Sequence, residues 1–126
     1  MYTDKDVYRT KSMVAAKGAS FKTIEIKGEA EFTGKGVSYC ATCDGPFFRN
    51  QELIVAGGGD SAVEEATFLT KFASTVHLVH RRDKLRASKI MQERAEADPK
   101  IKFHCNKSVE EIIGNGKLQK VVLKDN

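Results

Sequence analysis

The stretch that decides the fold is Leu53-Ile54-Val55-Ala56-Gly57-Gly58-Gly59-Asp60-Ser61-Ala62. Its four apolar residues predict a short, fully buried strand, and a helical pattern follows the three glycines. In the dinucleotide-binding form of this turn, Gly57 permits a tight bend, Gly59 lets the backbone approach a pyrophosphate and Ala62 lets helix and strand pack closely. The first helical N–H groups then point at the phosphates. One apolar helix face is predicted, made of Ala62, Ala66, Leu69 and Ala73. A flexible glycine loop is the alternative.

A second strand is predicted at Thr75-Val76-His77-Leu78-Val79, and its end carries a cluster of basic residues. About 20 residues past the glycines, a dinucleotide fold places the residue that meets the adenosine ribose. An NAD site has Asp or Glu there, whereas this chain has His80-Arg81-Arg82, with Arg86 four residues beyond Arg82. Arginine suits a 2′-phosphate because its planar fork makes paired hydrogen bonds. We expect Arg82 and Arg86 to face one anion if a helix has begun by then; the alternative is a solvated basic face.

The remaining chain supplies the other elements of an α/β domain. We expect a strand over Val7–Ala16, a short extended piece over Phe21–Lys27 and a linker over Gly28–Gly36. The chain is accordingly divided into an N-terminal segment, 1–28, and a dinucleotide-binding domain, 29–126.

Beyond the second strand, a helix is predicted over Ala87–Ala97 and ends before Pro99, and a third strand is predicted over Ile101–Cys105. Strands over Val109–Ile113 and Leu118–Leu123 flank Gly114-Asn115-Gly116, which indicates a β-hairpin. The order β-α-β-α-β predicts a Rossmann-like fold, with a central parallel sheet flanked by helices and an appended β-hairpin.

A second chemical motif is Cys40-Ala41-Thr42-Cys43, followed by Asp44. Thiols at this spacing close a small ring that opens readily, and the adjacent carboxyl could exchange a proton as it does so. One alternative is half of a zinc site completed by His104 and Cys105, although neighbours on a strand point to opposite faces. Another is a pair of packed structural cysteines. His77, His104 and Cys105 are most simply strand residues.

Length and composition limit the function classes. The chain has 126 residues, enough for one domain, and 40% of them are hydrophobic. The net charge of +4 suggests attraction for an anionic cofactor, because the basic residues lack the interleaved aromatics of a nucleic-acid site. No apolar run is long enough for a transmembrane helix, and the N-terminus does not resemble a signal peptide. Three cysteines argue against a secreted disulfide scaffold, so a cytoplasmic location is expected.

Three motifs in this order resemble low-molecular-weight, bacterial-type thioredoxin reductase. They are Gly36-Val37-Ser38-Tyr39-Cys40-Ala41-Thr42-Cys43-Asp44-Gly45, Gly57-Gly58-Gly59-Asp60-Ser61-Ala62-Val63-Glu64-Glu65-Ala66 and His80-Arg81-Arg82-Asp83-Lys84-Leu85-Arg86-Ala87. The resemblance runs from about Val7 to the end of the chain. It implies an enzyme in which electrons pass from NADPH through FAD and a cysteine disulfide to thioredoxin, with this chain as the central NADPH-binding domain.

The resemblance also implies roles for individual residues. Cys40 would exchange disulfides with thioredoxin, Cys43 would face the flavin and Asp44 would donate a proton. Glu64 would sit near the nicotinamide, and Lys35 would help thioredoxin to dock. Gly57 completes the cofactor-binding turn, and the pyrophosphate would lie along Gly58, Gly59, Asp60 and Ser61. The adenosine end would be held by His80, Arg81, Arg82 and Arg86.

The chain departs from the family pattern in ways that set further expectations. It has no flavin-type glycine fingerprint, lacks the C-terminal flavin motif and stops before the family's last strand, and Ala16-Lys17-Gly18 stands where the family has Ala-Thr-Gly. We therefore expect a fragment that binds NADPH but no FAD by itself and that is inactive without the FAD domain. The resemblance is also compatible with a homodimer. Three rivals stay open: a binding module without catalysis, a flavin-free thiol–disulfide exchanger, and the equivalent domain of an alkyl-hydroperoxide reductase flavoprotein.

Overall fold

The computed structural model describes residues 5–16, 18 and 20–126. Its regular elements, in chain order, are α1 (Glu29–Phe32), α2 (Ala41–Asp44), the 3-10 helix η1 (Gly45–Phe48), β1 (Glu52–Ala56), α3 (Asp60–Leu69), β2 (Thr75–His80), α4 (Lys89–Glu96), β3 (Ile101–Cys105), β4 (Lys107–Gly114) and β5 (Leu118–Asp125). None of the helices in these described ranges is long and apolar enough to cross a membrane.

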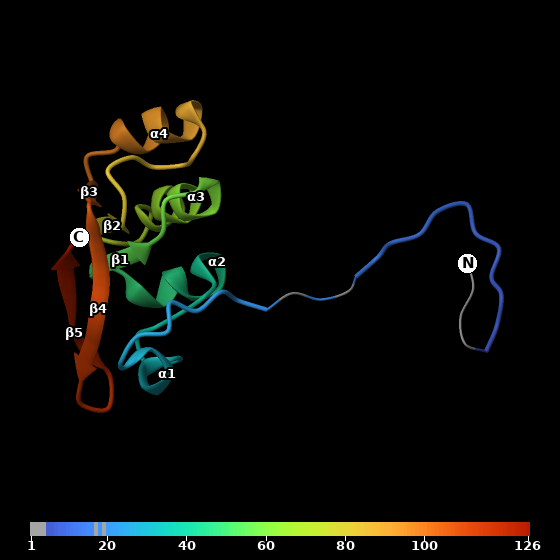
Figure 1. Ribbon diagram of the computed structural model, residues 1–126, viewed down its shortest axis with the longest axis horizontal. Helices are drawn as coiled ribbons and strands as arrows, with labels where there is room; N and C mark the ends of the chain where they lie inside the picture. Colours follow the sequence, from blue (N-terminus) through green and yellow to red (C-terminus); the bar gives the residue numbers. More distant parts are fainter. Residues whose placement is uncertain (1–4, 17, 19) are drawn as a thin grey trace.

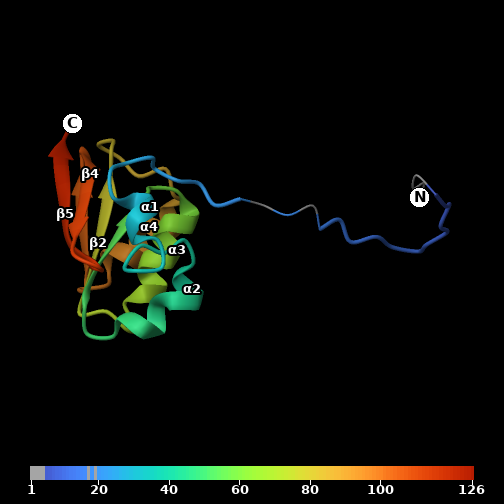
Figure 2. The ribbon, with the colours of Figure 1, turned by 90° about the horizontal axis from the view of Figure 1, so that it is seen from below.

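A parallel sheet of β1, β2 and β3, in that order, forms the centre of the fold. In its register Leu53 and Ile101 both lie opposite Val76 of the middle strand. The antiparallel hairpin β4–β5 lies on one side of this sheet, and α3 and α4 lie on the other (Figures 1 and 2). This arrangement confirms the predicted α/β fold with an appended hairpin. The carboxyl ends of β1 and β2 lie side by side, which brings the glycine turn close to the basic segment that follows β2.

The core lies between the sheet and helices α3 and α4. Val63 of α3 and Val76 of β2 are completely buried, and Leu78 is 1% exposed. The predicted apolar helix face is confirmed at Ala66 and Leu69, and Val63 also belongs to it, whereas Ala62 is only half-buried. Ala73 is buried as well, but it lies beyond the end of α3 at Leu69.

The prediction that the first strand is fully buried is wrong. Val55 is buried, but Ile54 is 38% exposed. The strand β1 lies at one edge of the sheet, and alternate side chains of a strand point to opposite faces. Only one of its two faces is packed under α3.

Two expectations for the N-terminal third are also wrong, the strand over Val7–Ala16 and the linker over Gly28–Gly36. Among the described residues of Val7–Ala16 only an isolated bridge at Val7 is strand-like, and this exposed segment extends away from the body of the protein (Figure 1). Within Phe21–Lys27 the strand pairing consists of one isolated bridge, between Lys27 and Glu111. The expected linker contains α1, whose Phe32 is 2% exposed and therefore part of the packed structure. Lys17 lies outside the described residues.

The helix predicted over Ala87–Ala97 begins two residues late, at Lys89, and ends at Glu96. Ala87 is buried, and its N–H donates to the carbonyl of Gly58, so this residue lies in the loop that packs against the glycine turn. The third strand matches its prediction over Ile101–Cys105, and both strands of the hairpin extend beyond the predicted ends.

Candidate functional site

The cysteine pair lies at the start of α2. Cys40 and Cys43 form a disulfide, with their Cα atoms 5.3 Å apart. Cys40 is the N-cap residue of α2, and the N–H of Cys43 donates to its Sγ at 3.3 Å. The zinc alternative is not supported, because both thiols are bonded to each other and the described part of the chain contains no group of three or more potential metal ligands.

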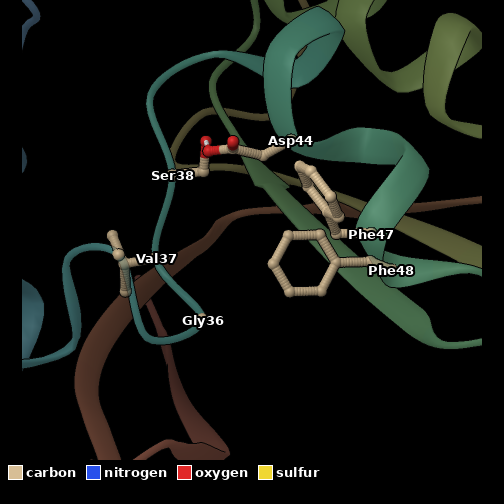
Figure 3. Close-up of a pocket in the computed structure, with 7 residues that line it drawn as sticks. Gly36, Val37, Ser38, Asp44, Phe47 and Phe48 are labelled. Carbon is tan, nitrogen blue, oxygen red and sulfur yellow. Dashed lines mark hydrogen bonds between the residues drawn. The ribbon is translucent and has the colours of Figure 1, made fainter.

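Ser38 is a site residue that the sequence reasoning missed. Its hydroxyl donates to Oδ2 of Asp44 at 2.5 Å and accepts from the N–H of Cys40 at 3.1 Å. Figure 3 shows the Ser38 hydroxyl beside the Asp44 carboxylate, next to the two phenylalanine rings of η1. A serine that accepts from the N–H two residues later is the ordinary spacing of a serine turn, and that spacing was the available signal.

A pocket of about 220 Å³ opens beside this arrangement. The Phe47 side chain is 78% exposed, so an apolar ring stands at the surface next to the disulfide segment. The pocket is lined by Gly34, Gly36, Val37, Ser38, Asp44, Phe47 and Phe48.

Tyr39, the residue before Cys40, is held by a buried carboxylate. Glu29 is 6% exposed, and its carboxylate accepts from the N–H groups of Ile24 at 3.1 Å and Glu25 at 2.7 Å and from the Tyr39 hydroxyl at 3.0 Å. Burial by itself would raise the pKa of Glu29, but these hydrogen bonds outweigh it and lower the pKa. The Tyr39 ring also stacks on Phe21, with centroids 5.6 Å apart. Residues 21–29 are therefore tied to the segment that leads into the disulfide.

The glycine turn between β1 and α3 has a different requirement at each glycine. A Cβ on Gly57 would lie 2.7 Å from the Cβ of Ala62, so close packing of helix on strand requires glycine there. A Cβ on Gly58 would lie 2.5 Å from Cε1 of the buried His80 ring. A Cβ on Gly59 would meet no atom within 4 Å, so this part of the backbone faces open space, as a backbone that a ligand approaches would.

The basic segment after β2 is bound to this turn through main-chain atoms. The carbonyl of Gly58 accepts from the N–H groups of Arg86 at 2.6 Å and Ala87 at 3.0 Å. The carboxylate of Asp60 accepts from the N–H of Ser88 at 2.7 Å. These bonds join the glycine turn to the basic segment, although α3 and β2 lie between them in the sequence. The carboxylate of Asp60 at the start of α3 therefore helps to hold the basic segment in place.

His80 lies beneath the turn and not on the surface. It is 6% exposed, and its Nε2 has no hydrogen-bond partner among the described residues. Burial lowers the pKa of His80, and the nearby charges of Arg86, Arg82 and Arg81 lower it further. The ring is therefore held neutral beneath Gly58 at neutral pH.

The three arginines are exposed, and no ion pair of the described residues involves them. The expectation that Arg82 and Arg86 share a helix face is wrong, because α4 begins only at Lys89. The basic cluster is instead carried by a loop, and the charges of all three arginines act on the pKa of His80.

The other predicted residues lie at the surface of the same domain. Ser61 and Glu64 are exposed on α3, and burial together with the charge of Glu64 raises the pKa of the neighbouring Glu65. Lys35 has an exposed side chain, and its carbonyl accepts from the N–H of Leu118 in β5 at 2.9 Å.

On the sheet face toward the hairpin, two histidines form a pair. Nδ1 of His77 lies 2.9 Å from Nε2 of His104, and Glu52 lies 3.3 Å from Nε2 of His77. Burial lowers the pKa of His104, and His77, Lys107 and Lys102 lower it further. The interpretation of both histidines as strand residues agrees with their positions in β2 and β3.

Comparison with known proteins gives consistent matches over most of the chain. A family model described as pyridine nucleotide-disulphide oxidoreductase matches residues 2–126. The thioredoxin reductase of Listeria monocytogenes serovar 1/2a is 56% identical over 110 residues, which are 87% of this chain and 34% of that protein. The thioredoxin reductase of Bacillus subtilis is 55% identical over 119 residues, 94% of this chain and 38% of that protein.

Solved structures show the same likeness. The thioredoxin reductase of Lactococcus lactis, in a crystal structure of its FR conformation, superposes with a TM-score of 0.83 at 55% identity, over 86% of this chain and 36% of that one. The thioredoxin reductase of Giardia duodenalis gives a TM-score of 0.82 at 43% identity, over 86% and 35% of the two chains. The chain thus spans 34% to 38% of the length of the two curated relatives named above.

Proposed function

The chain belongs to the pyridine nucleotide-disulphide oxidoreductase family, and on that premise we propose that it is the NADPH-binding and redox-disulfide domain of a thioredoxin reductase. In the intact enzyme the bound cofactors would supply hydride transfer from NADPH to FAD and electron transfer onward to the Cys40–Cys43 disulfide. The observation that carries the proposal is that one small domain holds a closed disulfide and a glycine turn joined to an arginine loop.

The residues at the glycine turn fit a pyridine nucleotide. The first N–H groups of a helix have no partner within the helix, and α3 begins at an open Gly59. We assign the pyrophosphate to the turn and the first turn of α3, and the nicotinamide end to Glu64 further along α3. The cofactor-binding residues in this part of the proposal are Gly57, Gly58, Gly59, Asp60, Ser61 and Glu64.

The arginine loop fits a 2′-phosphate. Arg81, Arg82 and Arg86 are exposed cations without acidic partners among the described residues, and the bonds to Gly58 hold their loop beside the turn. His80 supports this end from below, because its buried ring lies against Gly58. The adenosine end of NADPH is accordingly assigned to the loop, with His80 as its support.

Nucleotide preference tests this assignment directly. We expect calorimetric titration at low salt to show NADPH binding tighter than NADH by about 100-fold or more, because two charge-assisted hydrogen bonds each contribute about 1.5–3 kcal/mol. Arg81→Ala or Arg82→Ala should weaken NADPH binding about tenfold and leave NADH binding nearly unchanged. The preference should shrink as salt screens these exposed charges. Equal affinities of the unsubstituted chain for the two nucleotides would rule the assignment out.

The disulfide is assigned the role of passing electrons to thioredoxin. Cys40 is proposed as the thiol that exchanges with thioredoxin, Cys43 as the one that faces the flavin and Asp44 as the proton donor. The exposed ring of Phe47 and the exposed Lys35 lie on segments flanking the disulfide, where a protein substrate would contact the domain.

Electron transfer to a protein disulfide tests this role. The chain is reduced with dithiothreitol, desalted and mixed with oxidised thioredoxin, and the free thiols of both proteins are then counted by alkylation and mass measurement. We expect two thiols to appear on thioredoxin as the Cys40–Cys43 disulfide re-forms. A Cys40→Ser chain is the matched control and should transfer nothing. Thioredoxin that stays oxidised beside the reduced, folded chain would contradict the assignment.

The last part of the proposal concerns the division of the chain into domains, its partners and its location. Residues 29–126 are assigned to the NADPH-binding domain and residues 1–28 to the edge of an FAD domain, which in the family would hold the flavin. The contacts of Ile24 and Glu25 with Glu29 would then lie where the two parts meet. We place the protein in the cytoplasm, with thioredoxin and the FAD domain as partners and a homodimer as its assembly. Stoichiometric flavin absorbance from the purified chain alone would contradict this division.

A further inference from the structure

We infer that Ser38 is a positioning residue of the redox disulfide, and that it favours the closed disulfide by linking the two ends of the turn that carries both cysteines. The inference rests on the proposed redox role of Cys40 and Cys43. It concerns a residue whose hydroxyl contacts both the N–H of Cys40 and the carboxylate of Asp44, while its own side chain takes no part in the exchange of sulfur bonds.

The link connects the two ends of the segment Cys40–Asp44, which carries both cysteines. Ser38 Oγ accepts from Cys40 at the N-terminal end of α2, and its single hydroxyl proton goes to Oδ2 of Asp44 at the C-terminal end. At 2.5 Å the second bond has the short length of a hydroxyl–carboxylate hydrogen bond. Figure 3 shows both groups at the wall of the pocket, turned toward each other.

The link is expected to differ between the disulfide and the dithiol. In the oxidised protein the covalent bond holds the two cysteines, whose Cα atoms are 5.3 Å apart. In the dithiol, the turn depends on weaker contacts, such as the bond from the N–H of Asp44 to the carbonyl of Cys40 at 3.1 Å. A helix of four residues is not stable by itself, because nucleation fixes several backbone angles for each hydrogen bond gained. We therefore expect the Ser38 link to be formed less completely in the dithiol than in the disulfide form, and this difference favours the closed bond.

The expected size of the effect follows from the exposure of the link. Ser38 is exposed, so water competes for both of its hydrogen bonds. Loss of one net hydrogen bond changes an equilibrium constant by about 3- to 10-fold. For a two-electron couple this corresponds to a reduction potential that is higher by about 14–30 mV, because a tenfold change is about 30 mV. Removing Ser38 should make the disulfide easier to reduce.

The equilibrium is measured with dithiothreitol buffers at pH 7. As dithiothreitol loses two electrons and two protons and closes to its cyclic disulfide, the Cys40–Cys43 bond takes them up and opens to two thiols. After acid quenching, alkylation in denaturant adds one group to the oxidised chain, at Cys105, and three to the reduced chain. The ratio of the two masses gives the equilibrium constant without any cofactor.

Five variants separate the link from general effects on the fold. Ser38→Ala should shift the equilibrium toward the dithiol by about 3- to 10-fold, and Ser38→Thr, which keeps the hydroxyl, should restore most of it. In an Asp44→Ala background, Ser38→Ala should change the equilibrium by less than about twofold, because the partner is already gone. The matched control is Ser74→Ala, since Ser74 is also exposed and its hydroxyl makes no hydrogen bond in the part of the chain that the structure describes.

Two results would overturn the inference: the same equilibrium for Ser38→Ala as for the unsubstituted chain, or a Ser38→Thr chain that behaves like Ser38→Ala. If Ser38→Ala does not fold, hydrogen exchange of the Cys40 amide in the two redox forms of the unsubstituted chain decides. Slower exchange in the disulfide form than in the dithiol supports the inference, and equal rates in the two forms refute it. A failure of the proposed redox function looks different, because the disulfide of the unsubstituted folded chain would then resist dithiothreitol at every ratio.

Discussion

Gly58→Ala is expected to destabilise the protein through one identified contact. A Cβ at residue 58 would lie 2.5 Å from Cε1 and 2.6 Å from Cγ of His80, far inside van der Waals contact. The obstacle is a rigid aromatic ring that is 6% exposed, so it cannot swing into solvent as the end of a lysine side chain could. Either the ring or the glycine turn must move.

The expected loss is about 1–3 kcal/mol, the usual range for inserting a methyl group into a well-packed site. A displaced turn would also strain the bonds from Arg86 and Ala87 to the carbonyl of Gly58, so the loss should lie in the upper half of that range. For a domain of this size, about 2 kcal/mol lowers the thermal midpoint by roughly 5–10 °C.

Urea unfolding of single and double variants measures this contact. Gly59→Ala is the matched control, because a Cβ there meets no atom within 4 Å; it should therefore lose clearly less stability than Gly58→Ala, and what it loses reflects its N-cap position at the start of α3. In a His80→Ala background, Gly58→Ala should cost little, since the obstacle has been removed. An equal loss in both backgrounds would refute the reasoning, and so would a Gly58→Ala variant as stable as Gly59→Ala.

Three further predictions concern polar side chains and their hydrogen bonds or pKa values. Because the pKa of Glu29 is lowered in the folded protein, Glu29→Gln should cost about 1–3 kcal/mol at pH 7 in urea unfolding. The difference from the unsubstituted chain should begin to shrink as pH falls below 4.5, the ordinary pKa, and should disappear only below the lowered pKa of the folded protein; a difference that does not change at acidic pH would contradict this. The lowered pKa of His104 acts in the same direction, because the unfolded state binds a proton more readily than the folded state does. Stability should therefore fall as pH drops below about 6.5, and His104→Gln should flatten that slope between pH 7 and 5 in urea unfolding. Lys100→Met should lower the thermal midpoint by several degrees, because Nζ donates to the carbonyls of Thr70 at 2.9 Å and Ala73 at 3.0 Å; an unchanged midpoint would show that water replaces both bonds.

The fold could be predicted wherever local pattern and tertiary structure agree. The glycine turn, the alternation of β2 and β3 and Gly114-Asn115-Gly116 each specify their element within a few residues. The strand predicted over Val7–Ala16 does not form. A strand needs a neighbouring strand to pair with, and the sequence pattern does not show whether one is present. The start of α4 at Lys89 was also not predicted, and the sequence pattern did not show that Ala87 is bound to Gly58 from a distant part of the chain.

The sequence motifs predicted which residues form the candidate site, but they did not predict the contacts that hold those residues in place. The spacing of Cys40 and Cys43 indicated the pair that the structure bonds. The burial of His80 was not visible, because its place at the end of a strand does not say which face of the sheet it lies on. Ser38 was missed since one serine hydroxyl is chemically ordinary until its two partners are known.

Under the proposed assignment of the arginine loop to the nucleotide, its attachment to the glycine turn has a consequence for how cofactor choice can change during evolution or design. The loop is held by the N–H groups of Arg86, Ala87 and Ser88, and every residue except proline has such a group. Side chains at residues 81, 82 and 86 can therefore be exchanged while the loop keeps its place, provided that the carbonyl of Gly58 and the carboxylate of Asp60 remain. A few side-chain substitutions in this loop could therefore change which nucleotide the domain prefers while the backbone of the loop and of the glycine turn stays the same.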